Sequence, residues 1–185
     1  MFGLDGRSFF GNLYGHYLVH YQSNPKKVLE TANLNNTIRE IRNSKADIVG
    51  ICEIYEGQEE EITKKLRKLG YKFFFFGMGH KFKYNASHVV EVIASKIKGR
   101  QQNFNEWPVE NHLGGGGGFV VCKFPKIKTN IFLVHLGFPT RKYFFEQIKH
   151  AQEILKNLRG KIILMGDFNE EYYKIRVHFS NLDLI

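Results

Sequence analysis

The chain has 185 residues, of which 43% are hydrophobic and 15% aromatic, so it can bury a hydrophobic core without stabilisation by disulfide bonds or metal ions. Lys and Arg number 27 against 18 Asp and Glu, and the net charge of +9 favours a polyanionic partner, foremost nucleic acid. With two cysteines, no apolar stretch near the ~18 residues of a membrane span, and no signal-peptide pattern, the sequence argues against a disulfide-stapled or membrane-spanning protein and predicts a cytoplasmic one.

The order of hydrophobic runs predicts strands and helices that alternate along one domain, residues 1–185. Apolar residues four and three apart make 143–158 an amphipathic helix, and residues 98–118 are expected to form a long loop with Trp107 and a glycine run. Phe119 follows that run where a Walker loop needs Lys and then Ser or Thr, so a phosphate-cradling P-loop is rejected. The expected strands are 8–13, 46–53, 71–76, 89–95, 119–123, 131–136 and 161–165, and the other expected helices are 25–44 and 62–69.

Four consecutive phenylalanines, Phe73 to Phe76, indicate how these elements are layered. In a strand they place two rings on each face, and both faces must then be covered. A sheet that packs on a second sheet on one side and on helices on the other meets this requirement. The sequence therefore predicts an α/β fold.

Polar residues at the ends of apolar strands are the candidates for chemistry. Glu53 closes one strand, His135 lies near the end of another, and Asp167 and Asn169 follow a third in a Gly-Asp-Phe-Asn turn. Because side chains alternate with period two along extended backbone, Asp167 and Asn169 are expected on the same side. A carboxylate beside a neutral amide suits a hydrated divalent ion next to a phosphate. Each residue also has a purely structural interpretation, with His135 as a satisfied core histidine and Glu53 as a solvated strand end.

The order of these motifs resembles the endonuclease/exonuclease/phosphatase superfamily, the group that includes deoxyribonuclease I and exonuclease III-type repair enzymes. The matching segments are 46–53, 93–96, 132–136 and 163–169. The resemblance implies a four-layer α/β/β/α sandwich and a hydrolase that uses Mg²⁺, with Mn²⁺ as an alternative. It also implies that Glu53 binds the metal, that His135 contacts the scissile phosphate, and that Asp167 and Asn169 orient the attacking water.

The resemblance is incomplete at other positions. Asn12 is the candidate for a second metal ligand, from the opening strand, while Arg141 and Lys96 are the candidate substrate-binding cations. The family's final strands carry a Ser-Asp-His motif that has no counterpart before Ile185, so the sandwich is expected without its C-terminal strands.

The predicted function is a magnesium-dependent phosphodiester hydrolase, namely a nuclease that acts on DNA or RNA. Two alternatives stay open: a non-catalytic nucleic-acid-binding homologue that lost the general base, and a phosphomonoesterase or lipid phosphatase of the same fold. The sequence does not distinguish DNA from RNA, an endonuclease from an exonuclease, or one oligomeric state from another.

Overall fold

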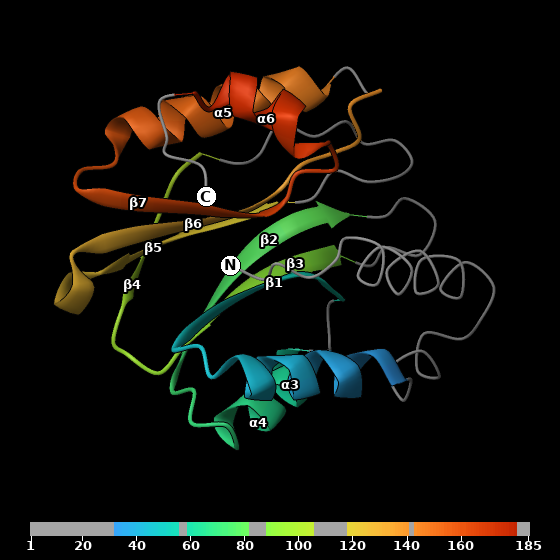
Figure 1. The fold of residues 1–185 in the computed structure, drawn as a ribbon, viewed down its shortest axis with the longest axis vertical. Coiled ribbons are helices and arrows are strands. Elements are labelled where there is room, and N and C mark those ends of the chain that lie inside the picture. The colour runs from blue at the N-terminus through green and yellow to red at the C-terminus, as the bar shows by residue number, and fades with distance from the viewer. Residues whose placement is uncertain (1–31, 56–58, 82–87, 106–117, 141–142, 181–185) are drawn as a thin grey trace.

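Two β-sheets lie face to face, and helices cover the outer side of each (Figure 1). The structure, a computed structural model, describes residues 32–55, 59–81, 88–105, 118–140 and 143–180. The first sheet has the antiparallel order β1-β3-β2, and the second has the order β4-β5-β6-β7, in which β6 and β7 are parallel. The strands are β1 (Ile48–Tyr55), β2 (Phe73–Lys81), β3 (His88–Ser95), β4 (Arg100–Gln102), β5 (Phe119–Phe124), β6 (Thr129–His135) and β7 (Lys161–Asp167). The helices are α3 (Ala32–Ser44), α4 (Glu59–Arg67), α5 (Tyr143–Asn157), α6 (Tyr172–His178) and the short 3₁₀ helix η1 (Pro125–Ile127).

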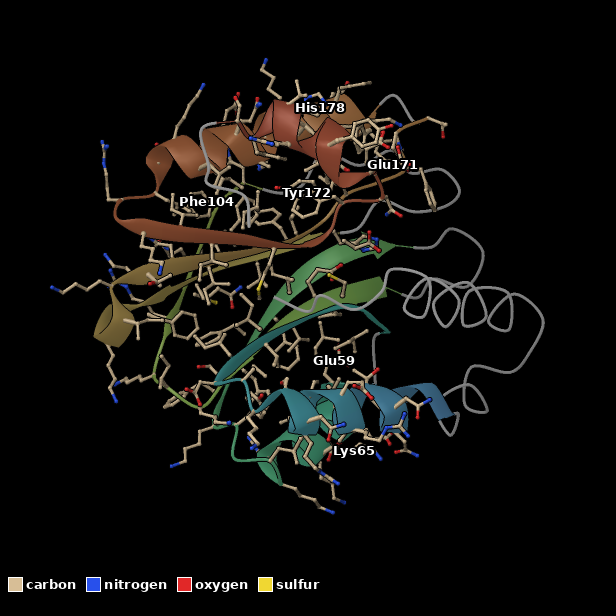
Figure 2. The ribbon with its side chains drawn as sticks, viewed as in Figure 1. Glu59, Lys65, Phe104, Glu171, Tyr172 and His178 are labelled. Carbon is tan, nitrogen blue, oxygen red and sulfur yellow. The ribbon has the colours of Figure 1, made fainter. Side chains whose placement is uncertain are left out.

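Helices α3 and α4 cover the outer face of the first sheet. Their apolar residues recur at helical spacing, and Ile41 of α3 and Leu66 of α4 are buried in one cluster with Val92 of β3. Helix α4 starts with three glutamates and ends in basic residues, an order that complements the helix dipole. Its outer face is charged: Lys65 lies on this layer (Figure 2) with its Nζ 3.4 Å from Oε1 of Glu61.

An apolar layer fills the space between the two sheets. Its buried members are Ile93, Val120, Cys122, Phe124, Ile131 and Leu133. The sheets lie close together at Gly50, where a Cβ would lie 2.5 Å from Cε of Met165 and 2.7 Å from Cδ1 of Leu133. Because interiors pack at crystal-like density, residue 50 has no room for a side chain.

The phenylalanine run of β2 contributes to two layers, as the sequence predicted. Phe75 packs in the layer between the sheets, with its ring centroid 6.0 Å from that of Phe124. Phe74 and Phe76 pack on the opposite face, in the cluster under α3 and α4. Both faces of this strand are therefore covered.

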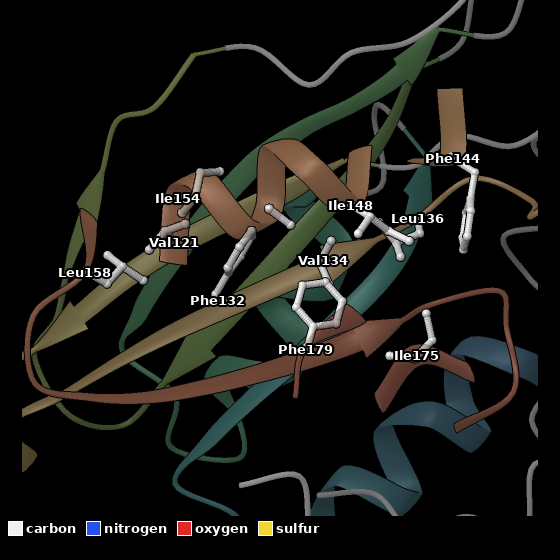
Figure 3. Packing of buried hydrophobic residues seen from close by; sticks show 11 residues of the cluster. Val121, Phe132, Val134, Leu136, Phe144, Ile148, Ile154, Leu158, Ile175 and Phe179 are labelled. Atoms are coloured by element: carbon white, nitrogen blue, oxygen red, sulfur yellow. The ribbon is translucent and has the colours of Figure 1, made fainter. Parts of the chain in front are cut away.

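Helices α5 and α6 cover the outer face of the second sheet (Figure 3). Alternate residues of the sheet point outward to meet them, so that Val134 and Phe132 of β6 pack against Ile148 of α5 and Phe179 after α6. The buried members of this cluster are Val121, Phe132, Val134, Leu136, Phe144, Ile148, Ala151, Ile154, Leu158, Ile175 and Phe179. The α/β/β/α layering expected from the sequence is confirmed.

The structure also differs from the sequence-based expectations in detail. Strand β4 lies inside the stretch predicted to be a loop, and β2 starts later and extends further than predicted. Helix α6 was not predicted, because it buries one apolar residue, Ile175, and so has no hydrophobic stripe. The predicted strand 8–13, the first part of the helix 25–44 and Trp107 lie outside the described residues. In the part of the chain that the structure describes, no helix is long and apolar enough to cross a membrane.

Candidate functional site

The ends of β6 and β7 place His135 and Asp167 side by side. The two strands are parallel, and these two residues, the last of each strand, are partners in the register. The ladder continues one step further, where the N–H of Leu136 donates to the carbonyl oxygen of Asp167 at 2.9 Å. Gly166 permits this approach, because its φ is +140° and a Cβ there would collide with the carbonyl oxygen of Val134. Two residues far apart in sequence are thus fixed on one edge of the sheet.

Asn169 folds back over this edge in a tight turn. Its φ of +48° lies in the left-handed region, its N–H donates to Oδ1 of Asp167 at 2.8 Å, and its Nδ2 donates to the carbonyl oxygen of Leu136 at 2.7 Å. The expectation that strand alternation would align Asp167 and Asn169 is therefore corrected: a carboxylate-capped turn brings them together. Glu171 and Tyr172 follow, where α6 begins (Figure 2). Within the described residues, Oδ2 of Asp167 makes no hydrogen bond and is available to a water or a cation.

A buried glutamine of α5 holds the loop that follows β6. Gln147 is 0% exposed, and its Oε1 accepts a hydrogen bond from the N–H of Gly137 at 2.7 Å. A buried N–H without an acceptor is costly, so this contact pins the backbone two residues after His135. The loop is thereby anchored to the helical layer.

A buried carboxylate of the first sheet reaches His135 across the gap between the sheets. Glu91 of β3 is 0% exposed, and its Oε1 lies 3.3 Å from Nδ1 of His135, whose side chain is 3% exposed. The candidate site therefore lies where the two sheets meet, and each sheet supplies one member of this pair.

Strand β1 contributes a β-bulge opposite Glu91, and Cys52 lies in it. The sulfur of Cys52 is 3.9 Å from the carbonyl oxygen of Val134. Burial raises the pKa of this thiol well above its usual range, and the nearby carboxylates of Glu91 and Asp167 raise the pKa further. The carboxylates of Glu91 and Asp167 thus both lie near the thiol of Cys52, and the negative potential of two carboxylates favours a bound cation.

Glu53, the predicted metal ligand, has its backbone in the same bulge, and its side chain lies outside the described atoms. A β-bulge changes the direction in which side chains point, and bulges are common next to active sites, so this one is consistent with a functional role for this end of β1. Asn12 and Arg141, the second metal ligand and a substrate contact in the prediction, lie outside the described residues. The roles of all three stay predictions.

Lys96 is not brought to the other candidates. Its Nζ lies 3.5 Å from Oδ1 of Asp47 and 5.3 Å from the ring centroid of Tyr71, beside the start of β1. The reason is strand direction: β3 runs antiparallel to β1, so the residue after β3 lies at the edge of the sheet opposite the bulge. The structure thus places Lys96 in an ion pair with Asp47, away from His135 and Asp167, and its contact with substrate stays a prediction.

Glu91 is a residue of this site that the sequence interpretation missed. Glu91 had a readable signal, a single carboxylate in the apolar strand His88–Ser95, which is the same kind of exception that singled out His135. Among the described residues, no group of three or more His, Cys, Asp or Glu is arranged to hold a metal ion.

Comparisons with solved structures place the architecture among known folds. A protein of the endonuclease/exonuclease/phosphatase family from Leptotrichia buccalis superposes with a TM-score of 0.58 at 14% identity, over 88% of this chain and 70% of that one. ANGEL2, a 2',3'-cyclic phosphatase in complex with adenosine-2',3'-vanadate, gives 0.57 at 15%, over 89% and 54%. TDP2 from D. rerio, complexed with a single-strand DNA product, gives 0.55 at 16%, over 82% and 60%. The chain thus spans less than two thirds of the latter two proteins, and at these identities the likeness is one of fold.

A search of curated protein sequences found no significant match. The sequence model of the Endonuclease/Exonuclease/phosphatase family, in contrast, matches residues 12–178, a span that contains His135, Asp167 and Asn169. Because this match covers most of the chain and the layered fold agrees with it, the chain belongs to the endonuclease/exonuclease/phosphatase family.

Proposed function

We propose that residues 1–185 form one domain that hydrolyses phosphodiester bonds of nucleic acid with the help of a divalent metal ion. The family includes nucleases, phosphodiesterases and phosphatases. The observation that carries the proposal is the convergence of His135, Asp167 and Asn169 on one edge of the second sheet. A donor, a carboxylate and an amide at one strand end are the groups that in-line attack of water on phosphorus requires.

The roles follow from the contacts. Asp167 has one oxygen committed to the turn, so its second oxygen, Oδ2, positions the attacking water and accepts its proton. Asn169 is fixed through its Nδ2, which leaves its side-chain oxygen to face the water or the phosphate. His135 donates a hydrogen bond to a phosphate oxygen as charge develops there. Removing one such preorganised donor typically lowers turnover by ~100- to 1,000-fold.

The metal is assigned to Glu53 and Asn12, with Mg²⁺ as the ion and Mn²⁺ as its substitute. Family members generally use divalent metals. The fit of this site to a cation is supported by the carboxylates of Glu91 and Asp167, which both lie near Cys52 and, after burial, raise the pKa of its thiol. When bound, the ion neutralises charge on the phosphate oxygens.

Nucleic acid is the proposed substrate for two reasons. The net charge of +9 provides the counterion-release term that dominates affinity for polyphosphates. Of the similar structures, TDP2 holds a single-strand DNA product and ANGEL2 an adenosine derivative. A reducing, cytoplasmic compartment is proposed as well, in keeping with the free thiols of Cys52 and Cys122.

The test is cleavage of supercoiled plasmid and of labelled single-stranded DNA and RNA, with Mg²⁺, with Mn²⁺ and with chelator. Asp167→Asn and Glu53→Gln are the test variants, and Glu153→Gln, an exposed carboxamide exchange on α5, is the matched control. Metal-dependent cleavage that is lost in both test variants and kept in the control supports the proposal. Full turnover in Asp167→Asn overturns the assignment of that residue.

A second candidate substrate is a terminal or cyclic phosphate, favoured by the likeness to ANGEL2. Adenosine 2',3'-cyclic phosphate and a chromogenic phosphomonoester are therefore included in the assay. Turnover of either, without cleavage of polymers, would reassign the substrate while keeping the site. Binding of oligonucleotides without any hydrolysis would identify a binding module.

A further inference from the structure

The second sheet carries a cluster of positive charges at the end away from the candidate site, where β6 and β7 begin. Residues 97–105, 119–130 and 154–163 contain eight lysines and arginines and neither Asp nor Glu. The structure describes all three segments, which form β4, the β5–η1 hairpin up to the start of β6, and the turn from α5 into β7. Seven of the eight residues are exposed and Lys123 is half-buried. We call these eight the basic surface: Lys98, Arg100, Lys123, Lys126, Lys128, Lys156, Arg159 and Lys161.

Backbone pairing and close packing bring the three segments together. Arg100 and Lys123 are direct partners in the register of β4 and β5. Gly160, in the turn before β7, lies against the hairpin, because its φ is +92° and a Cβ there would lie 3.6 Å from the carbonyl oxygen of Lys128. The charged residues on either side of these contacts therefore belong to one continuous surface.

A buried asparagine holds this end of the sheet in a fixed arrangement. Asn130 is 2% exposed, its Nδ2 donates to the carbonyl oxygen of Arg159 at 2.8 Å, and its Oδ1 accepts from Nε2 of Gln102 at 3.0 Å. One side chain thus links β6 to β4 and to the turn before β7. Because a buried amide without these partners would be costly, the three segments are held in this arrangement.

The charges of the basic surface are not neutralised by neighbouring carboxylates. Within the described residues, none of the eight makes an ion pair, whereas Lys65, Lys96 and Lys174 elsewhere each do. Like charges directly opposite each other on paired strands, as at Arg100 and Lys123, are destabilising. A bound polyanion would remove this repulsion.

The basic surface and the candidate site lie at opposite ends of the same strands. Strand β6 runs from Thr129, beside the hairpin, to His135, so the two places are six residues or ~20 Å apart along it. Figure 1 shows the hairpin with η1, β4 and the start of β7 at the left, and the ends of β6 and β7 toward the right. A phosphate that reacts at His135 and Asp167 therefore cannot touch the basic surface.

We propose that the basic surface is a second nucleic-acid contact, which binds the phosphate backbone of the substrate far from the bond that is cleaved. Nucleic acid as the substrate rests on the proposed function. The four strands of this sheet span ~14 Å from β4 to β7. Since each strand of a duplex carries a phosphate every ~3.4 Å along its axis, the surface has room for about four phosphates.

A nucleic acid fits this surface better than an anionic membrane does. A surface that binds a membrane buries apolar side chains below the lipid headgroups. The hairpin offers one large exposed apolar residue for this, Ile127, which is 44% exposed. Charge without a sequence of apolar side chains is the pattern that binds a phosphate backbone.

A salt titration of binding tests the proposal without any need for cleavage. Labelled single-stranded and duplex oligonucleotides of ~30 nucleotides, long enough to extend past the basic surface, are titrated with protein in chelator at rising salt. The test protein combines four exchanges on the basic surface, Lys126→Gln, Lys156→Gln, Arg159→Gln and Lys161→Gln. The control protein removes the same charge from exposed helical positions, through Arg42→Gln, Lys64→Gln, Lys68→Gln and Lys149→Gln.

The slope of log affinity against log salt should be smaller by about 3–4 in the test protein, since each lost phosphate contact lowers it by about 0.9. The control protein should keep the slope of the unsubstituted protein. Equal slopes for the test and control proteins overturn the proposal, and so does failure of the unsubstituted protein to bind any oligonucleotide. Vesicles of phosphatidylserine and phosphatidylcholine are titrated in parallel. Loss of vesicle binding in the test protein, with its oligonucleotide slope unchanged, would assign the surface to a membrane and overturn the proposal.

Substrate length provides the kinetic test. With Mg²⁺ and an oligonucleotide of ~30 nucleotides, KM should rise about tenfold or more in the test protein and not in the control protein, while kcat stays the same. Substrates shorter than about six nucleotides do not reach ~20 Å from the cleaved bond, so their KM should be equal in all three proteins. An unchanged KM for the long substrate in the test protein contradicts the proposal. Absence of hydrolysis in the unsubstituted protein, with the salt titration as expected, would count against the proposed function alone.

Discussion

Replacing Asn169 by Ala and, separately, by Gly separates its backbone role from its side-chain role. Both substitutions remove the hydrogen bond from Nδ2 to the carbonyl oxygen of Leu136. Both keep the backbone N–H that donates to Oδ1 of Asp167. They differ in conformational cost, because φ is +48° at this position and glycine adopts that region freely while alanine does not.

The two costs can be estimated from the structure. The lost hydrogen bond is worth about 1 kcal/mol, and the Leu136 carbonyl can recover part of it from water. An alanine in the left-handed region adds about 1–2 kcal/mol, whereas glycine adds none and relieves the smaller penalty that asparagine carries. The Ala variant should therefore unfold about 1–2 kcal/mol more readily than the Gly variant. For a domain of this size that difference corresponds to roughly 3–6 °C in Tm.

Differential scanning calorimetry of the three proteins measures the stability term, and single-turnover cleavage measures the chemistry. Both variants should lose ~100-fold or more in turnover, since neither has the amide. Equal Tm values for the Ala and Gly variants would refute the left-handed turn. A Gly variant that keeps its activity would show that the Asn169 side chain takes no part in the reaction.

Three further perturbations test the frame around the site. Gly166→Ala should destabilise the protein by about 1–3 kcal/mol or more, because its φ of +140° is strained for any other residue and the new Cβ meets the carbonyl of Val134; an unchanged urea midpoint would contradict this geometry. Gln147→Met should lower the free energy of unfolding by about 1–3 kcal/mol, because it leaves the N–H of Gly137 without its acceptor. Urea unfolding should show this loss of stability, and the turnover assay should show a loss of activity. No change in either measurement would remove Gln147 from the site. Burial raises the pKa of the Cys122 thiol from 9.0 to about 12. Between these two pH values the folded state therefore keeps a proton that the unfolded state releases. The contribution of this thiol to stability is full below pH 9 and falls by about 1.4 kcal/mol per pH unit up to pH 12. Cys122→Ala should therefore show a shallower alkaline loss of stability, and equal slopes for the two proteins would contradict the burial of the thiol.

Strands and layers were readable from the sequence because they depend on patterns that a single chain displays. The phenylalanine run of β2 predicted a strand covered on both faces, and the structure confirms it. His135 and Asp167 were both found at the ends of apolar runs. Their pairing follows from the parallel register of β6 and β7, a geometry that the carboxyl-end rule anticipates.

Lys96 lies apart from these residues because of strand direction. Strand β3 is antiparallel to its neighbours, so the residue after its carboxyl end lies beside Asp47 on the far edge. Strand direction depends on which strands pair, and pairing is decided by contacts across many residues. The turn at Asn169 was not predicted, because the alternation of side chains from one face to the other assumes an extended backbone. The carboxylate of Asp167 instead accepts a hydrogen bond from the N–H of Asn169 and stabilises a tight turn.

Glu91 illustrates why a site between two sheets is harder to read than one on a single edge. Its partner His135 lies 44 residues away on the other sheet, and no local pattern links them. What sets their separation is the thickness of the apolar layer, which at Gly50 leaves no room for a Cβ against Met165 and Leu133. A layer packed to that density cannot expand locally, so a methyl group added at its centre must push the sheets apart or displace side chains. The spacing between Glu91 and His135 is therefore a property of the core, and the packing that stabilises the fold also determines how His135 is held.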